Sequence, residues 1–305
     1  MHLDPISALR SSVRVSLTDG NSYILVPSRL PFGGSPCPNE FCLMSDMITD
    51  TINDLLEEDS WNQKEIRSEF TSKVPEAKGL EDNEPFAQAK PLSIKIPLEE
   101  NGKADVYIDD IITIAVEKGD NIERIRSAPS TVIHAVTINS SSYPLPRDDI
   151  IEDEKNIAEG GPEETKICLG WLLNTRKLMI SLPLHKAKAW DSQITEAISK
   201  KSINLKTLES IIGRLENIAQ IFPMLGHFLN NIRFLQSKAI DKKHNIFFSK
   251  RAKDDLSLSR SFIERAKKWY KFESVNIQGA RSNSHRRCFR AWHGSFCISR
   301  ACLVF

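Results

Sequence analysis

The spacing of apolar and polar positions predicts short strands near the start of the chain. Apolar residues alternate with polar ones over 13–17, which is the period-two pattern of a strand, and a second apolar run covers 23–26. Asp-Gly-Asn at 19–21 lies between the two runs and is a strong turn signal. The pattern therefore predicts strands within residues 1–30, arranged as a hairpin.

A segment rich in proline and glycine follows at 29–38, and its composition excludes a helix and favours a rigid, shaped loop. From Asn39 apolar residues recur every three or four positions, which predicts a helix that ends near Trp61. The apolar stripe of this helix is expected at Phe41, Met44, Met47 or Ile48, Ile52 and Leu55. Residues 62–100 are polar and weakly periodic, so we expect a long surface insertion or two short elements there.

The centre of the chain predicts two β-rich arms around an acidic pair. The arms lie within 104–116, and Asp-Asp at 109–110 separates them. Residues 121–135 predict a helix whose apolar positions face inward until Pro129 disturbs the pattern. Residues 139–166 are polar and are predicted to be mostly loop.

A predicted strand pair, 167–173 and 178–182, precedes a helical region that Pro183 opens. Apolar residues at helical spacing continue along most of that region. The tail at 273–305 has a different character, since from residue 274 onward it holds five Arg, no Lys, no acidic residue and three of the six cysteines. We expect this tail to be an aberrant or disordered basic segment.

Composition narrows the classes of function. Lys plus Arg is 41 and Asp plus Glu is 40, and this net charge of +1 excludes a globally basic, histone-like binder. The apolar fraction of 40% and the charged fraction of 27% are ordinary for a globular protein. No apolar run reaches the roughly 18–20 residues of a membrane span, and six cysteines without a CxxC pair favour a reducing interior. We therefore expect a cytoplasmic or nuclear protein without a membrane partner.

The sharpest chemical feature is Tyr-Ile-Asp-Asp at 107–110. Two carboxylates at the tip of an apolar hairpin repel each other unless a cation intervenes. Mg²⁺ prefers oxygen ligands of this kind together with substrate phosphates. Two such ions about 3.5–4 Å apart can activate an attacking hydroxyl and stabilise the leaving oxygen. The alternative is a turn whose aspartates bond local backbone N–H groups.

Two further features are compatible with binding to phosphates. Backbone N–H groups in the loop at 29–38 can approach a phosphate, although no Gly-Lys-Ser/Thr follows and a plain structural turn is the alternative. Basic residues of the helical block can neutralise phosphates or line a solvated face. They are Lys186, Lys188, Lys200, Lys201, Lys206, Arg214, Arg233 and Lys238. The seven histidines show no zinc-site spacing.

Taken in order, four segments resemble reverse transcriptases. Residues 29–41 are similar to motif B, 107–110 to the Tyr-x-Asp-Asp motif C, and 168–183 to the primer-grip strands and their exit to the thumb. Residues 208–215 and the segments after them resemble the thumb helices. The resemblance is to the polymerases of long-terminal-repeat and DIRS-like retrotransposons and spans positions 20–270.

The resemblance implies an α+β fold, with a right-hand polymerase palm built from an antiparallel sheet and helices, and a helical thumb after it. The palm would cover 1–182, with an insertion at about 62–100, and the thumb or connection would cover 183–272. The tail at 273–305 would replace the start of a ribonuclease-H-like domain, and we interpret it as a segment read out of frame.

The resemblance also implies functional residues at the matching positions. Asp109 and Asp110 match the carboxylates of motif C, which would be catalytic and would bind Mg²⁺ (or Mn²⁺). The residues near nucleotide and template would be Phe32, Gly33, Gly34 and Tyr107, and those of the primer grip Gly170 and Trp171. The lysine of motif D would be Lys155 or Lys166.

The family activity is RNA-directed DNA polymerisation by nucleotidyl transfer, with an RNA template, a DNA primer and dNTPs as partners. One metal-binding aspartate of the family lies in motif A, some tens of residues before motif B, whereas only 28 residues precede Arg29. The setting of Asp4 does not resemble motif A. We therefore expect a polyprotein fragment that begins after motif A and is inactive. The alternatives are a non-catalytic nucleic-acid-binding remnant and a relic without a molecular role.

Overall fold

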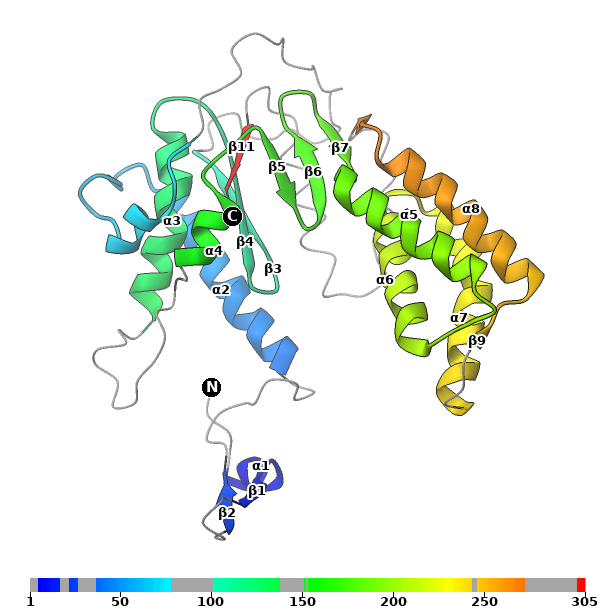
Figure 1. Ribbon diagram of the computed structural model, residues 1–305. Helices are drawn as coiled ribbons and strands as arrows, with labels where there is room; N and C mark the ends of the chain where they lie inside the picture. The colour runs from blue at the N-terminus through cyan, green and yellow to red at the C-terminus, as the bar shows by residue number, and fades with distance from the viewer. Residues whose placement is uncertain are drawn as a thin grey trace.

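Helices and small antiparallel sheets build this α+β protein, as the computed structural model shows (Figure 1). The residues that the structure describes are 5–16, 22–26, 37–77, 101–137, 151, 153–242, 246–271 and 301–304. Within these ranges no helix is both long enough and apolar enough to cross a membrane.

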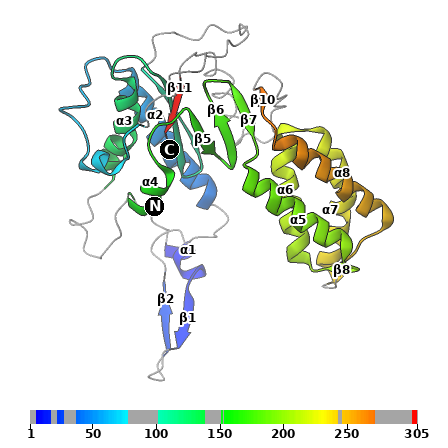
Figure 2. The same cartoon turned by 45° about the horizontal axis from the view of Figure 1, so that its top comes forward.

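A small N-terminal unit stands apart from the other elements (Figure 2). It consists of helix α1 (Pro5–Arg10) and a hairpin of β1 (Val13–Ser16) and β2 (Ser22–Leu25). The predicted hairpin is confirmed, but the prediction of strand is wrong for residues 5–10, where proline occupies the first helical position and loses no hydrogen bond there. The predicted turn at 19–21 lies outside the described residues.

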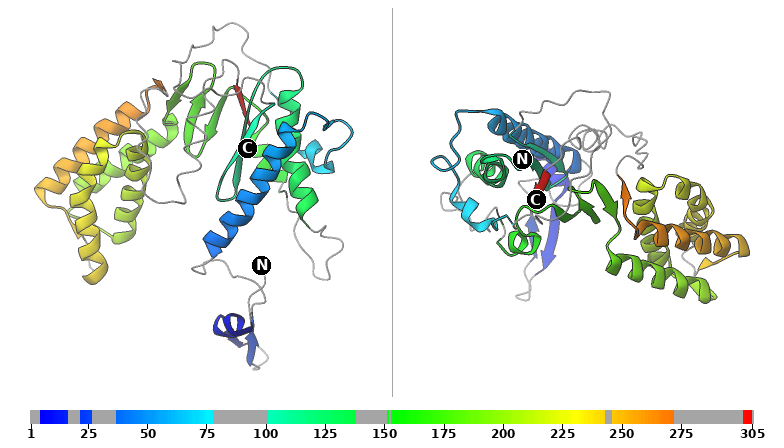
Figure 3. Two further views of the ribbon diagram at one scale, coloured as in Figure 1. Left: turned by 180° about the vertical axis from the view of Figure 1, so that it is seen from behind. Right: turned by 90° about the horizontal axis from the view of Figure 1, so that it is seen from above.

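The long helix α2 (Cys37–Glu57) confirms the predicted helix, with slightly earlier ends. Only the C-terminal half of the predicted stripe is buried, since Ile52 is fully buried and Leu55 is partly buried, while Phe41, Met44 and Met47 are about half exposed. The N-terminal half of α2 extends past the neighbouring sheet, as the left view of Figure 3 shows, so it has no sheet to pack against. The periodicity of apolar residues predicted the helix correctly. How much of the helix is buried depends on the length of the sheet beside it.

The central hairpin of β3 (Lys103–Tyr107) and β4 (Asp110–Val116) confirms the two predicted β-rich arms. One face of the hairpin packs on α2 and on α3 (Asn121–Val136), and together they form a core of buried apolar residues. That core consists of Ile52, Leu56, Trp61, Ala104, Ala115, Ile125, Ala128 and Val132. The predicted disturbance at Pro129 is wrong, since α3 continues through it and buries Val132 on the next turn. Packing of that face outweighs the lost hydrogen bond of the proline.

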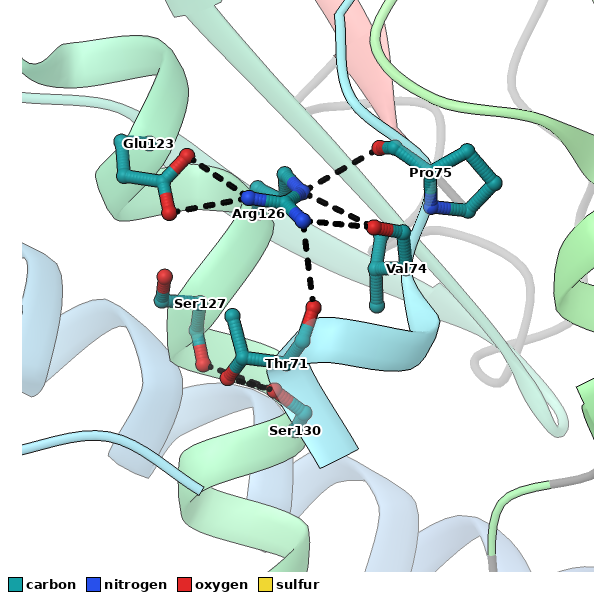
Figure 4. Close-up of polar contacts among 7 residues, drawn as sticks. All are labelled: Thr71, Val74, Pro75, Glu123, Arg126, Ser127 and Ser130. Carbon is teal, nitrogen blue, oxygen red and sulfur yellow. Dashed lines mark hydrogen bonds and ion pairs between the residues drawn. The ribbon is translucent and has the colours of Figure 1, made fainter. Parts of the chain in front are cut away.

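The segment after α2 holds one short 3₁₀ helix, η1 (Glu69–Lys73), and Arg126 of α3 fastens it (Figure 4). The guanidinium donates to the carbonyls of Thr71, Val74 and Pro75 at 2.7–3.3 Å. Its remaining nitrogen donates to both carboxylate oxygens of Glu123 at 2.9 Å. The predicted insertion at 62–100 is therefore folded against α3 as far as residue 77, and the rest lies outside the described residues.

A second antiparallel sheet has the strand order β10 (Tyr270–Lys271), β7 (Met179–Ser181), β6 (Trp171–Asn174), β5 (Thr165–Cys168). The predicted single strand at 167–173 is wrong, because a tight turn at Leu169 and Gly170 divides it into β5 and β6. Both turn residues have positive φ, 46° and 87°, the geometry of a two-residue hairpin turn. An apolar run without a polar break concealed this turn.

Two elements lie in segments that were predicted to be irregular. Helix α4 (Asp153–Glu159) lies within the predicted loop at 139–166 and buries none of its residues. Strand β11 (Ala301–Val304) lies within the predicted disordered tail and pairs antiparallel with β4. Figure 1 shows β11 between β4 and β5. Because β11 covers one edge of β4, the hairpin does not present an open apolar edge there.

Four helices lie between β7 and β10 in the chain and pack together at one end of the molecule (Figure 2). They are α5 (Leu184–Ser199), α6 (Leu205–Ile221), α7 (Met224–Lys242) and α8 (Lys250–Ala266), with the short pair β8 (Ser202–Ile203) and β9 (Ile246–Phe247) between them. The predicted apolar stripes are confirmed, since Leu208, Leu215 and Ile232 are fully buried. Helix α8 begins at Lys250, because Ser249 caps it by accepting a bond from the Ala252 N–H.

The second core runs from the four helices through the second sheet and includes Ile112 of β4. The opposite face of β4 contributes Ala115 to the first core. Alternate side chains of one strand therefore join the two cores. This fixes the β3–β4 hairpin between the helices α2 and α3 on one side and the β5–β6 turn on the other.

Candidate functional site

The acidic pair lies at the tip of the β3–β4 hairpin, as the sequence predicts. Tyr107 pairs with Asp110, and the two residues between them, Ile108 and Asp109, form the turn. Ile108 has a φ of 60°. This backbone conformation costs energy in a β-branched residue and is usually adopted by glycine. The turn is therefore held in a strained shape by the strands on either side of it.

Lys155 of α4 faces this tip. Its Nζ lies 3.1 Å from Asp110 Oδ1 and 3.8 Å from Glu159 Oε1. The hydrogen bond to Asp110 is the main cause that raises the pKa of Lys155, and the charges of Glu159 and Asp109 act in the same direction. The ammonium group therefore remains charged at neutral pH, beside an acidic pair that needs a cation.

The sequence left Lys155 and Lys166 as alternatives for one role, and the structure separates them by position. Lys166 is buried, and its Nζ donates to the carbonyls of Gly160 at 3.0 Å and Gly161 at 2.8 Å. It supports the loop after α4 from inside. Lys155, in contrast, bonds to Asp110 of the acidic pair.

Cys168, at the end of β5, lies near the same tip. Burial, and next the negative charge of Asp110, raise the pKa of its thiol to about 12. A thiol with this pKa is protonated at neutral pH and is therefore a poor nucleophile. Cys168 also shares a buried core with Ile112 of β4, so the second sheet adjoins the hairpin that carries the acidic pair.

The hairpin tip offers an incomplete set of ligands for the expected cofactor, Mg²⁺ or Mn²⁺. No group of three His, Cys, Asp or Glu side chains that could hold a metal ion occurs among the residues that the structure describes. Asp109 is exposed, and Asp110 is bonded to an ammonium group. Two-metal chemistry needs carboxylates that hold both ions. The described residues therefore do not by themselves fit a pair of divalent cations.

A groove of about 490 Å³ adjoins the β5–β6 turn and lies between that turn, α5 and α6. Its lining includes Leu169, Gly170, Lys186, Trp190, Glu209, Ser210, Gly213, Arg214 and Asn217. Arg214 donates to Gln193 Oε1 at 2.6 Å, so its guanidinium is held at the groove wall. A Cβ added to Gly170 would lie 3.1 Å from Lys186 Nζ, which shows how closely this lysine covers the turn.

The two residues predicted for the primer grip lie in different environments. Gly170 lines the groove, whereas Trp171 is 5% exposed and belongs to the second core. The Trp171 indole N–H is buried and has no hydrogen-bond partner in the described part of the chain. Trp171 therefore supports the turn by packing. Lys186 and Arg214 supply the polar surface of the groove, whereas the sequence identified them only among the eight basic residues of the helical region.

The predicted nucleotide and template residues Phe32, Gly33 and Gly34 lie outside the described residues. Tyr107 is partly buried and is placed opposite Asp110 on the hairpin. The elements that surround the acidic tip in the described part of the chain are therefore β3, β4, α4 and β5.

Asp105 is a charged residue of this region that the sequence analysis did not single out, although it interrupts an apolar arm. It shares a face of the hairpin with Tyr107 and Asp110. Its Oδ1 accepts from the Val106 N–H at 2.8 Å, and its buried Oδ2 has no partner among the described residues. Burial raises the pKa of Asp105, and the nearby charge of Asp46 acts in the same direction.

This raised pKa predicts a pH dependence of stability. Native Asp105 binds a proton more tightly than the unfolded chain does, so its contribution to stability falls as pH rises from the unfolded value of 3.8 through the raised native value. Asp105→Asn should increase the free energy of unfolding at pH 7 and reduce its decline across that pH window. Urea unfolding at several pH values measures this, with Asp50→Asn on the exposed surface of α2 as the control. Equal profiles for the wild type and the Asp105 variant would contradict the assignment.

Comparisons with known proteins identify no relative. The chain matches no protein-family model, and searches of curated proteins and of solved structures find no similar protein.

Proposed function

We propose that this chain is a reverse-transcriptase-like palm and thumb fragment that binds an RNA–DNA template–primer duplex and does not catalyse nucleotide addition by itself. In this proposal β3 and β4 belong to the palm, the β5–β6 turn is the primer grip, and α5–α8 are the thumb. The proposal combines the motif order of the sequence with the placement of those motifs in the fold.

The observation that carries the proposal is the proximity of the acidic tip to the basic groove. Ile112, which follows Asp110 by two residues on β4, belongs to the same buried core as Cys168. The next two residues, Leu169 and Gly170, line the groove. A duplex that lies in the groove would thus bring its end to the hairpin tip.

The groove also has the surface that a phosphate backbone requires. Lys186 and Arg214 provide two cations beside a single acidic residue, Glu209. Along α6, Ser210 and Gly213 present small groups, and a Cβ at Gly213 would meet no atom within 4 Å. A helix face of small residues lets a duplex approach closely, and the cations neutralise its phosphates.

Binding to a short RNA–DNA hybrid tests the proposal. We expect that Lys186→Met with Arg214→Met weakens binding and makes the slope of log K against log salt less negative by about 1.8, since each phosphate contact contributes about −0.9. Fluorescence anisotropy across a salt series measures both quantities. The matched control is Lys250→Met with Arg251→Met, two exposed cations at the start of α8. No binding at low salt, or an equal loss in both double variants, would exclude the groove.

The catalytic half of the proposal has its own test. The purified chain should not extend a primer on poly(rA) or on heteropolymeric RNA, because the described residues hold no group of three side chains that could bind a metal ion and Asp110 is bonded to Lys155. Gel analysis of primer length measures this. Robust extension that Asp110→Asn abolishes would show that the protein is a complete polymerase.

A further inference from the structure

The hairpin of β1 and β2 has one apolar face. In its antiparallel register Val13 lies opposite Leu25 and Val15 lies opposite Tyr23, so these four side chains share one face. The residues of the opposite face are Arg14, Ser16, Ser22 and Ile24. Val13, Tyr23 and Leu25 are 47–59% exposed. An isolated hairpin is marginally stable in water at best, so we expect a further surface to cover the apolar face.

One side of helix α2 is a second exposed surface. Leu43, Met47, Asp50 and Asp54 recur every three or four residues, which places them on the same side of the helix. Leu43 is 64% exposed and Met47 is 48% exposed, and both aspartates are exposed as well. Ile52, by contrast, lies on the opposite side of the helix and is fully buried. The exposed side of α2 therefore combines apolar and acidic groups that the core of the protein does not use.

The N-terminal unit and α2 also carry opposite charges. Within 5–16 and 22–26 the charged side chains are Arg10 and Arg14, and these described ranges contain no acidic residue. Helix α2 has five acidic residues and no basic one. Opposite charges favour the encounter of two surfaces and set their orientation, while apolar contact supplies most of the affinity. The apolar face of the hairpin and the exposed side of α2 are therefore complementary in both respects.

Within one chain these two surfaces do not cover each other, because Figure 1 and Figure 2 both show the N-terminal unit apart from α2. A second copy of the chain offers the missing surface. In a two-fold symmetric pair, each N-terminal unit would lie on α2 of the other copy, so the contact would form twice. This doubling matters, because a stable interface buries about 800 Å² on each partner and one hairpin face is small beside that area.

We propose that the N-terminal unit is a dimerisation arm, which docks through the apolar face of its hairpin on the exposed side of α2 in a second copy of the chain. The dimer is two-fold symmetric and holds this contact twice. This inference concerns the association of the chain with itself and does not depend on binding to nucleic acid.

Sedimentation velocity of the full chain over a concentration series measures the dimer. Leu25→Lys on the arm and Met47→Lys on α2 should each raise the dissociation constant about thirtyfold, since each substitution is present twice in the symmetric pair. Met224→Lys makes the same change at an exposed methionine of α7 and should leave the dissociation constant unchanged. An equimolar mixture of the two weakened variants should associate more tightly than either variant alone, because one intact contact forms again.

Charge reversal provides an independent readout. Arg10→Glu with Arg14→Glu should weaken the dimer. Adding Asp50→Lys with Asp54→Lys should restore it, which misfolding of a variant could not do. A chain that stays monomeric at all concentrations would exclude a second copy as the partner, and a dimer that Leu25→Lys and Met47→Lys leave intact would exclude these two surfaces. Failure of the mixture or of the combined charge reversal to recover the dimer would overturn the reciprocal contact. These outcomes are independent of the anisotropy result with the RNA–DNA hybrid.

Discussion

Replacing Arg124 by methionine is expected to lower the free energy of unfolding by about 3 kcal/mol. Arg124 lies on α3, is 7% exposed, and reaches the C-terminal end of α2. Its guanidinium donates to the carbonyls of Leu56, Glu58 and Trp61 at 2.8–3.0 Å. The last carbonyls of a helix have no partner within the helix, and a cation at that end also interacts favourably with the helix dipole.

Methionine would fill much of the space but would donate no hydrogen bond. The carbonyls of Leu56 and Glu58 would each lose a donor but keep another, from the Asn101 side chain and from the Trp61 N–H respectively. The Trp61 carbonyl would lose its bond to Arg124, and a buried carbonyl without a donor costs about 1–3 kcal/mol. The guanidinium also lies 4.9 Å from the ring centroid of Trp61, and this cation–π contact would be lost. Because these contacts join α2 to α3, the whole first core should lose stability.

Urea unfolding followed by circular dichroism measures the effect. Arg67→Met is the matched control, since Arg67 is exposed on the segment after α2. Its free energy of unfolding should change by no more than about 0.5 kcal/mol. Similar losses in the two variants would mean that charge, rather than the bonds to α2, explains the result.

Replacing Gly161 by alanine is expected to cost about 2 kcal/mol, a typical value for overpacking in a well-packed site. A Cβ at Gly161 would lie 2.1 Å from the carbonyl oxygen of Glu76 and 2.6 Å from that of Pro75. Both are backbone atoms, which cannot rotate away as a side chain can. The Pro75 carbonyl also accepts from Arg126 Nε at 3.1 Å (Figure 4), so the segment is anchored against moving aside.

A second glycine provides the control for this substitution. A Cβ at Gly213, within α6, would meet no atom within 4 Å. Alanine is favoured over glycine in a helix interior by about 1 kcal/mol, so Gly213→Ala should be stabilising. Thermal and urea unfolding of both variants should therefore shift in opposite directions. A neutral Gly161→Ala would contradict the close contact between the loop after α4 and the segment after η1.

Periodicity predicted most of the elements correctly, and its failures share a cause. The helical stripes of α5–α8 and the arms of β3 and β4 recur along many residues, and the structure has elements at those places. Short changes of direction inside apolar runs were missed, as at Leu169 and Gly170, because a turn of two residues leaves little trace in a pattern. The short helix α4 was missed for the opposite reason, since it buries nothing and has no apolar stripe to detect.

The sequence by itself determined that Asp109 and Asp110 lie at the tip of an apolar hairpin, because alternating arms on both sides of two acidic residues fix that geometry locally. Only the tertiary structure decided that Lys155, rather than Lys166, reaches Asp110, and that Lys186 and Arg214 line one groove. The partners in these contacts are separated by tens of residues, and their distance depends on how helices and sheets pack. Packing of that kind is a property of the whole fold and is not encoded in any local spacing.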